Sequence, residues 1–272
     1  MGTWDDGLLD NDTALDGLAE LVDGVVQDIE SIGAGKPTAA AAGRLAGAIG
    51  VLLQLAPDRF EKGEPAGERL AAAVRGQAKG VARLGAGARR VLGKLAAGEG
   101  LAPAERRGRM ARTHAALLHA GSEESRFGRR VPALFAGAAG AAYVRAVARR
   151  CVAMVAEDFE DPANWGDLCR EGIGIGGLAA LLVLAPCRVA ARTIAGWRSK
   201  ARRGLAGLEA EDDEELGFHR GYYRNLDRVL GILMRRFAAP PSARRGAGRS
   251  SRSAGRSATG GRLIGGPSRR GR

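Results

Sequence analysis

Aromatic residues are scarce in this chain of 272 residues, because phenylalanine, tryptophan and tyrosine together make up only 4% of it. Aromatic side chains supply much of the buried area in most protein cores. A core in this chain therefore has to consist of alanine, valine and leucine. Apolar residues reach 45% of the sequence, so the composition predicts a real but thin aliphatic core.

Cysteine and histidine are also rare, with three residues of each. Cys151, Cys169 and Cys187 form no CxxC pair, so we interpret them as small buried residues in a reducing compartment. His114 and His119 lie five residues apart and face different sides of a helix, and no HExxH motif occurs. We therefore expect no disulfide framework, no metal site and no cofactor.

Motifs typical of catalysis and nucleotide binding are lacking. No GxSxG elbow is present, and no cysteine has an evident histidine partner. Gly172, Gly174 and Gly177 satisfy GxGxxG, but no β-strand precedes them, so we interpret them as positions where a helix approaches a neighbour closely. Around Lys36, Pro37 occupies the place that a phosphate loop gives to serine or threonine. The sequence therefore favours a non-catalytic role.

Hydrophobic runs are too short for a clear membrane span. The most apolar run, residues 172–187, is about 24 Å long as a helix, whereas a bilayer core is about 30 Å thick. We interpret this run as a buried helix, and membrane insertion is the alternative. The first residues are acidic and do not form a secretory signal, so we expect a cytoplasmic location, with peripheral membrane association as the alternative.

Helical periodicity, by contrast, runs through most of the chain, and no segment shows the alternation of a strand. The fold class that we expect is all-α, a bundle of roughly six to eight helices. A basic segment follows Pro186. The expected helices cover residues 13–32, 37–56, 65–97, 103–120, 132–159, 172–186 and 216–237, with Pro37 near the start of the second and Pro57 past its end.

Charge is segregated along the sequence, which carries a net charge of +12. Residues 1–30 contain nine acids and no base, whereas residues 240–272 contain nine bases and no acid. The latter segment is rich in arginine, glycine and serine, and it has too few apolar residues to offset its ordering entropy, so we expect a disordered tail. The expected divisions are an acidic head with the first two helices (1–60), a helical bundle rich in alanine, glycine and arginine (61–239), and the tail. A bundle continuous with the head is the alternative.

The segment 65–97 is predicted to form one long amphipathic helix. Its apolar residues share one sector, and opposite them lies a set of cations that we call the basic stripe. A solvated face is the simplest interpretation. The sharper interpretations are binding to anionic lipid, to nucleic-acid phosphates, or to an acidic helix. We favour the last, and we expect the acidic helix at residues 12–30 of this chain to be the partner. The basic stripe consists of Arg75, Lys79, Arg83, Arg90 and Lys94.

Several glycines fall inside the expected helices, where each costs on the order of 1 kcal/mol relative to alanine. Helices weakened in this way need tight tertiary packing or a partner to persist. The glycines in question are Gly43, Gly47, Gly76, Gly80, Gly85, Gly137 and Gly140.

The first sixteen residues combine glycine, tryptophan and an Asp-Asn-Asp triplet at fixed spacing. The residues concerned are Gly2, Thr3, Trp4, Gly7, Asp10, Asn11, Asp12, Ala14 and Asp16. They match the pattern with which members of bacterial family 4259 of domains of unknown function begin, so this segment resembles that family. Asp5 and Leu9 stand where that family has glycine and phenylalanine. The resemblance implies no mechanism, because the family has no established activity. In physical terms, the glycines permit a turn, Trp4 and Leu9 fold back onto the first helix, and the Asp-Asn-Asp triplet caps that helix. Binding of a cation or a basic partner by these carboxylates is the alternative.

Together these features predict a non-catalytic structural or protein-interaction module with an unidentified protein partner. A membrane-associated helical protein is the first alternative. Nonspecific binding of nucleic acid through the basic tail is the second, because flexible cationic segments contact phosphates without reading bases.

Overall fold

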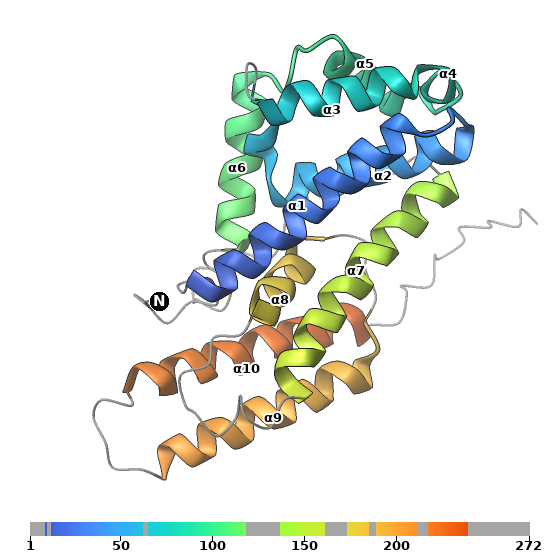
Figure 1. Ribbon diagram of the computed structural model, residues 1–272. Coiled ribbons are helices and arrows are strands. Elements are labelled where there is room, and N and C mark those ends of the chain that lie inside the picture. Colours follow the sequence, from blue (N-terminus) through green and yellow to red (C-terminus); the bar gives the residue numbers. More distant parts are fainter. Residues whose placement is uncertain are drawn as a thin grey trace, which may run out of the picture. The chain divides into compact units, whose positions relative to one another are not determined.

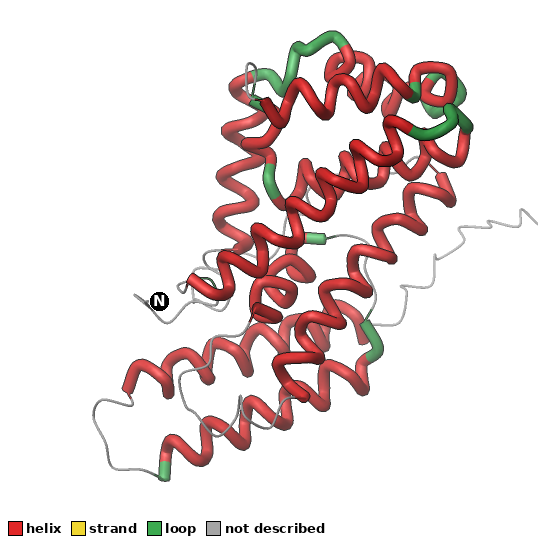
Figure 2. Tube along the Cα trace, in the orientation of Figure 1, coloured by secondary structure: helices red, strands yellow, loops and turns green. Residues whose placement is uncertain are grey.

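Helices account for nearly all of the described structure, as Figures 1 and 2 show. The computed structural model describes residues 9, 12–61, 65–117, 137–160, 173–184, 189–210 and 217–238. Within these ranges there are helices and no strand, which confirms the predicted all-α fold. The elements are α1 (Asp12–Ala34), α2 (Ala39–Leu55), the 3-10 helix η1 (Pro57–Phe60), α3 (Pro65–Gly76), α4 (Ala78–Val81), α5 (Ala86–Ala96), α6 (Pro103–Leu117), α7 (Gly137–Glu160), α8 (Ile173–Val183), α9 (Ala191–Glu209) and α10 (Gly217–Ala238).

Helix α2 begins and ends where its sequence indicates. Thr38 is the N-cap, and its Oγ1 accepts a hydrogen bond of 3.0 Å from the amide of Ala41. Pro37 precedes this cap, and Pro57 follows the helix and begins η1. Proline lacks the amide that a helix interior needs, so it marks both boundaries. Nearly every residue of α2 is buried, which places this helix at the centre of the fold.

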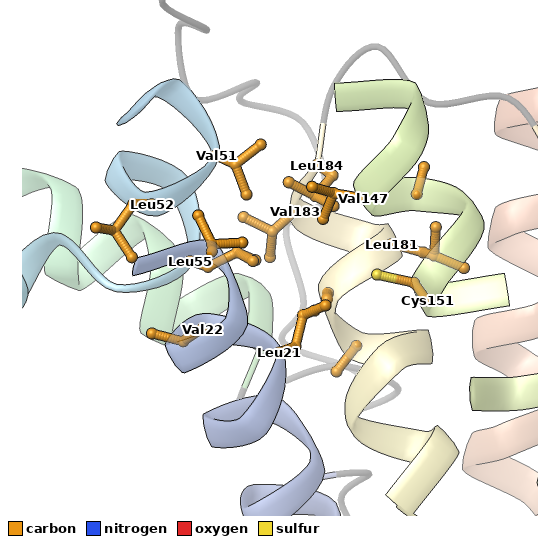
Figure 3. Packing of buried hydrophobic residues seen from close by; sticks show 14 of the residues in the cluster. Leu21, Val22, Val51, Leu52, Leu55, Val147, Cys151, Leu181, Val183 and Leu184 are labelled. Atoms are coloured by element: carbon orange, nitrogen blue, oxygen red, sulfur yellow. The ribbon is translucent and has the colours of Figure 1, made fainter. Parts of the chain in front are cut away.

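The core lies where α1, α2, α7 and α8 meet, and Figure 3 shows its side chains from close by. Leu21 comes from α1, Val51 and Leu55 from α2, Val147 from α7 and Leu181 from α8. Each of these five side chains is at most 5% exposed. As the composition predicts, the core is mainly aliphatic, and each buried leucine or valine contributes about 1.5–3 kcal/mol of hydrophobic stabilisation.

Helix α8 contains the most apolar run of the sequence, and all described residues of 174–184 are buried. It packs against α1, α6 and α7, so protein covers it on several sides. The interpretation of this run as a buried helix agrees with these contacts. Among the described residues, no helix combines the length and the apolar character needed to cross a bilayer.

Glycines allow the central helices to approach one another closely. A Cβ added to Gly47 on α2 would lie 2.6 Å from the carbonyl oxygen of Gly140 on α7. A Cβ added to Gly177 on α8 would lie 2.9 Å from the carbonyl oxygen of Cys151 on α7. Both distances are too short for a side chain, so larger residues would force the helices apart. The predicted close approach of the GxGxxG segment is confirmed for Gly177.

The prediction of a single helix over residues 65–97 is wrong. Three helices, α3, α4 and α5, replace it, with breaks at Gln77 and at residues 82–85. Helix α5 packs against α3 instead of extending it. The basic segment after Pro186 forms one more helix, α9, so the described residues contain ten α-helices where six to eight were expected.

Gln77 explains the first of these breaks. Its buried side chain donates hydrogen bonds from Nε2 to the carbonyl oxygens of Ile32 (2.8 Å) and Gly35 (2.9 Å), at the end of α1. The last carbonyls of a helix have no partner within it, so this glutamine caps α1 from a distance. A contact between residues 45 positions apart leaves no trace in local periodicity.

Two of the glycines expected inside helices lie at the start of a helix instead. Gly85 precedes α5 in extended conformation, and Gly137 is the first residue of α7 with a φ of 66°. A Cβ at either position would have no atom within 4 Å. The prediction that these two glycines lie inside helices is therefore wrong, because they stand at helix starts. Gly137 instead supplies the left-handed backbone conformation that other residues adopt rarely.

The helices α9 and α10 pair with each other through a seam of buried apolar residues. Gly204 on α9 faces the ring of Tyr223 on α10, and a Cβ at position 204 would lie 2.6 Å from that ring. Trp197 on α9 packs against Phe159 at the end of α7, with ring centroids 6.0 Å apart. Lys200 adds a hydrogen bond to the carbonyl oxygen of Phe159. Aromatic side chains therefore join α9 both to α10 and to the end of α7.

The head and the bundle share one core. Helices α1 and α2, which belong to the expected head (1–60), pack against α3, α7 and α8 of the segment 61–239. The segments expected as head and bundle are therefore packed against each other. The tail at 240–272 lies outside the described residues.

Candidate functional site

Most of the residues that resemble the family of unknown function lie outside the described residues. These are Gly2, Thr3, Trp4, Gly7, Asp10 and Asn11. Leu9 is 2% exposed and belongs to the core, as expected for a residue that folds back onto the first helix. Asp12 is the first residue of α1, and Asp16 is exposed.

Ala14 has a structural role within this motif. It is fully buried, and its carbonyl oxygen lies next to Gly176 on α8, where a Cβ would also clash with the amide of Leu18. Two small residues therefore face each other where α1 crosses α8. A larger side chain at either position would push α8 away from α1.

Three acids of α1 form ion pairs with bases from elsewhere in the chain. Asp23 pairs with Arg59 at 3.2 Å and Glu30 with Arg69 at 2.7 Å. Both pairs are largely exposed, so each contributes about 0–1 kcal/mol. The third pair joins Asp28 to α7. The predicted attraction between the acidic head and basic neighbours is therefore present, but the bases that provide it are not those of the basic stripe.

Asp28 is the centre of a hydrogen-bonded network between α1 and α7. Its Oδ2 accepts a hydrogen bond of 2.7 Å from the hydroxyl of Tyr143 and one of 2.8 Å from Nη1 of Arg150. Burial, together with the hydrogen bond to the carboxylate, raises the pKa of Tyr143 far above its usual value. The hydrogen bond that Arg150 donates to Asp28 raises the pKa of Arg150 as well. At neutral pH, Tyr143 therefore keeps the hydroxyl proton that it donates to Asp28, and Arg150 is positively charged.

Sequence reasoning missed this network. Tyr143 and Arg150 are seven residues apart, a spacing that places both on one face of α7. That spacing is the only local signal, because Asp28 lies 115 positions before the tyrosine.

The residues of the basic stripe all lie on α3, on α5 or in the α4 region between them, and all five are exposed. Arg75 donates a hydrogen bond of 2.9 Å from Nη1 to the carbonyl oxygen of Ala96, which ties α3 to the end of α5. Within the described part of the chain, no acid pairs with any of the five. The stripe is therefore a set of unneutralised cations on a helical hairpin and not one face of a long helix.

A second cluster of charges joins α9 to α10. Asp227 accepts hydrogen bonds at Oδ1 from Nε of Arg198 (2.7 Å) and from Nε of Arg202 (2.8 Å). The bond from Arg198, supported by the bond from Arg202, holds the pKa of Asp227 below its usual value. Arg224 pairs with Glu209 at 3.0 Å. This cluster fixes the register of the two helices.

His219 and the cysteines are the remaining side chains that could carry chemistry. His219 on α10 is half-buried, and this burial lowers its pKa. Cys151 is buried on α7, while Cys169 and Cys187 lie outside the described residues. In the part of the chain that the structure describes, no three histidine, cysteine, aspartate or glutamate side chains gather as a metal site would require.

Comparison with models of protein families, with curated proteins and with solved structures finds no match for this chain. The resemblance of the first sixteen residues to family 4259 therefore stays a prediction.

Proposed function

We propose that this chain is a non-catalytic protein-interaction module that binds an acidic segment of a partner protein through the basic stripe. The observation that carries the proposal is the exposure of these five cations without an acidic partner among the described residues. A surface of one sign attracts and orients a partner of the other sign.

The charge imbalance around the basic stripe is large. Residues 65–117 carry eleven lysines and arginines but only three acids, Glu68, Glu99 and Glu105. The nearest acidic helix, α1, already pairs Glu30 with Arg69 at the beginning of α3. An external acidic segment would therefore meet cations that the fold itself leaves unneutralised.

An acidic protein fits this surface better than a lipid surface does. A helix that lies in a membrane interface buries its apolar face in the lipid. The apolar faces of α3 and α5 are already buried in protein, since Leu70, Val74 and Leu92 are at most 2% exposed. Only the charged face is available to a partner.

Nucleic acid is also less well suited to this surface. Proteins that bind single strands combine cations with aromatic side chains on which the bases stack. Residues 65–117 contain no phenylalanine, tryptophan or tyrosine. Phosphate contacts remain available, so nucleic acid is one outcome that the experiment has to distinguish.

The test compares three probes on the full chain: fluorescent poly-L-glutamate, single-stranded DNA and phosphatidylglycerol vesicles. The first variant replaces Arg83, Arg90 and Lys94 by serine. The matched control replaces three exposed arginines of α9 and α10 by serine and so removes the same charge: Arg192, Arg203 and Arg235.

We expect wild type and control to bind poly-L-glutamate with similar affinity at low salt, and the stripe variant to bind at least about tenfold more weakly. Screening by salt weakens all of these complexes. Equal losses in variant and control would overturn the proposal. So would stripe-dependent binding of DNA or vesicles without binding of poly-L-glutamate.

A further inference from the structure

A concave site lies between the end of α1, the beginning of α2 and the middle of α7. Its volume of about 350 Å³ falls in the range of small-molecule sites, about 300–1,000 Å³. The protein-interaction proposal does not use this site. The side chains that give it polarity are Asp28, Ser31, Lys36, Arg44, Tyr143 and Arg150.

The lining is strongly cationic. Lys36, Arg44 and Arg150 contribute three positive charges, and Asp28 is the single acid among the lining residues. Lys36 and Arg44 are exposed, and neither pairs with an acid of the described chain. Asp28 already accepts two hydrogen bonds, from Tyr143 and Arg150, so its charge is engaged on the wall of the site. The site therefore keeps a net positive charge for a ligand.

Arg150 is held in position before any ligand arrives. Nη1 donates to Asp28, whereas no described residue accepts a hydrogen bond from Nε or Nη2. A guanidinium presents its donors in a planar fork that matches the oxygens of a phosphate. An arginine fixed by a neighbouring carboxylate also loses less rotamer entropy on binding.

The beginning of α2 adds to the positive potential of the site. Thr38 is the N-cap of that helix, and Ala41 in its first turn lines the cavity. The N-terminal end of a helix dipole favours anions. This contribution supports the three side chains and would not define a site without them.

We propose that this cationic site binds a phosphate monoester, with Lys36, Arg44 and Arg150 contacting the phosphate oxygens. A phosphate monoester carries close to two negative charges and three terminal oxygens, so it matches three cationic side chains better than a carboxylate does. A soluble phosphorylated metabolite and the headgroup of phosphatidic acid share this chemistry.

The experiment titrates the full chain with glycerol 3-phosphate in a calorimeter. The variant Lys36→Gln/Arg44→Gln removes two exposed cations that pair with no acid among the described residues, so circular dichroism should show an unchanged fold. The control Lys79→Gln/Arg83→Gln removes the same charge from the basic stripe. We expect at least about tenfold weaker binding in the first variant and unchanged binding in the control.

A second arm measures sedimentation with phosphatidylcholine vesicles, with and without phosphatidic acid. Site-dependent binding of glycerol 3-phosphate identifies a soluble ligand class, and site-dependent binding to phosphatidic acid alone identifies a lipid headgroup. The proposal is overturned if neither probe binds wild type, or if the control loses as much affinity as the variant. Neither the phosphate probe nor the vesicles measure binding of poly-L-glutamate. The phosphate site can therefore be refuted without refuting the protein-interaction function, and the reverse is also true.

Discussion

Gly47 on α2 and Gly140 on α7 pack with their backbones in direct contact. A Cβ at position 47 would come within 2.6 Å of the Gly140 carbonyl oxygen and 2.8 Å of its Cα. Alanine is the better helix former by about 1 kcal/mol, so helix propensity alone would favour it at both positions. The glycines are therefore a requirement of tertiary packing between two central helices.

Replacing Gly47 by alanine should destabilise the protein. The added methyl group has to separate α2 from α7, and overpacking of this kind costs about 1–3 kcal/mol. Chemical unfolding followed by far-ultraviolet circular dichroism measures the change. Gly93→Ala on α5 is the matched control, because a Cβ there meets no atom within 4 Å. That control should be neutral or more stable by up to about 1 kcal/mol, and equal effects in both variants would contradict the packing argument.

Gln77→Ala should lower the free energy of unfolding by about 1–3 kcal/mol. The substitution removes both hydrogen bonds to the end of α1 and leaves the carbonyls of Ile32 and Gly35 without them. Hydrogen exchange should show faster opening of the last turn of α1. The exposed Gln27 on α1 serves as control, and Gln27→Ala should change stability by less than about 0.5 kcal/mol. An unperturbed α1 in Gln77→Ala would refute the capping role.

Tyr143→Phe should reveal a dependence on alkaline pH. The folded protein raises the pKa of Tyr143 above the value of about 10 in an unfolded chain. The resulting stabilisation is complete below about pH 10 and decreases as the pH rises above it. At neutral pH we expect the variant to be about 2 kcal/mol less stable, since it loses a bond to a carboxylate. Urea unfolding at increasing pH should show that this difference in stability shrinks. A difference that stays constant would contradict a raised pKa of Tyr143 in the folded protein.

Asp227→Asn should weaken the pairing of α9 with α10 by about 2 kcal/mol at neutral pH. The pKa of Asp227 is lower in the folded protein, so its stabilisation is present above the unfolded value of about 4. It is lost as the pH falls through the lowered folded pKa. Thermal unfolding of both proteins should therefore differ at neutral pH and converge in acid. A difference that persists in strong acid would show that the charge of Asp227 is not responsible.

Local signals predicted the helices well. The boundaries of α2 follow from Pro37 and Pro57, and the buried run in α8 follows from its composition. The prediction of one long helix over residues 65–97 was wrong because the apolar periodicity continues through the break at Gln77. Gln77 lies seven residues after Leu70, so it falls in the apolar sector of such a helix. It is fully buried there and bonds to the end of α1.

The candidate sites were predicted less well. The sequence located the cations of the basic stripe and the acids of the head, but it suggested that the two sets meet. The acids of α1 instead pair with Arg59, Arg69 and Arg150, which lie on three other elements. Charge patterns indicate that acids and bases attract, but they do not say which pairs the packing brings within 4 Å.

The sequence by itself determined that this protein is helical, that its core is aliphatic, and that its helices need glycine to pack. These properties depend on residue type and on spacing within a few turns. Only the tertiary structure decided which glycines touch and where the segment from α3 to α5 bends. It also decided that Asp28 meets Tyr143 and Arg150. Contacts over more than a hundred positions depend on how helices cross, and side-chain periodicity along one helix does not encode that crossing.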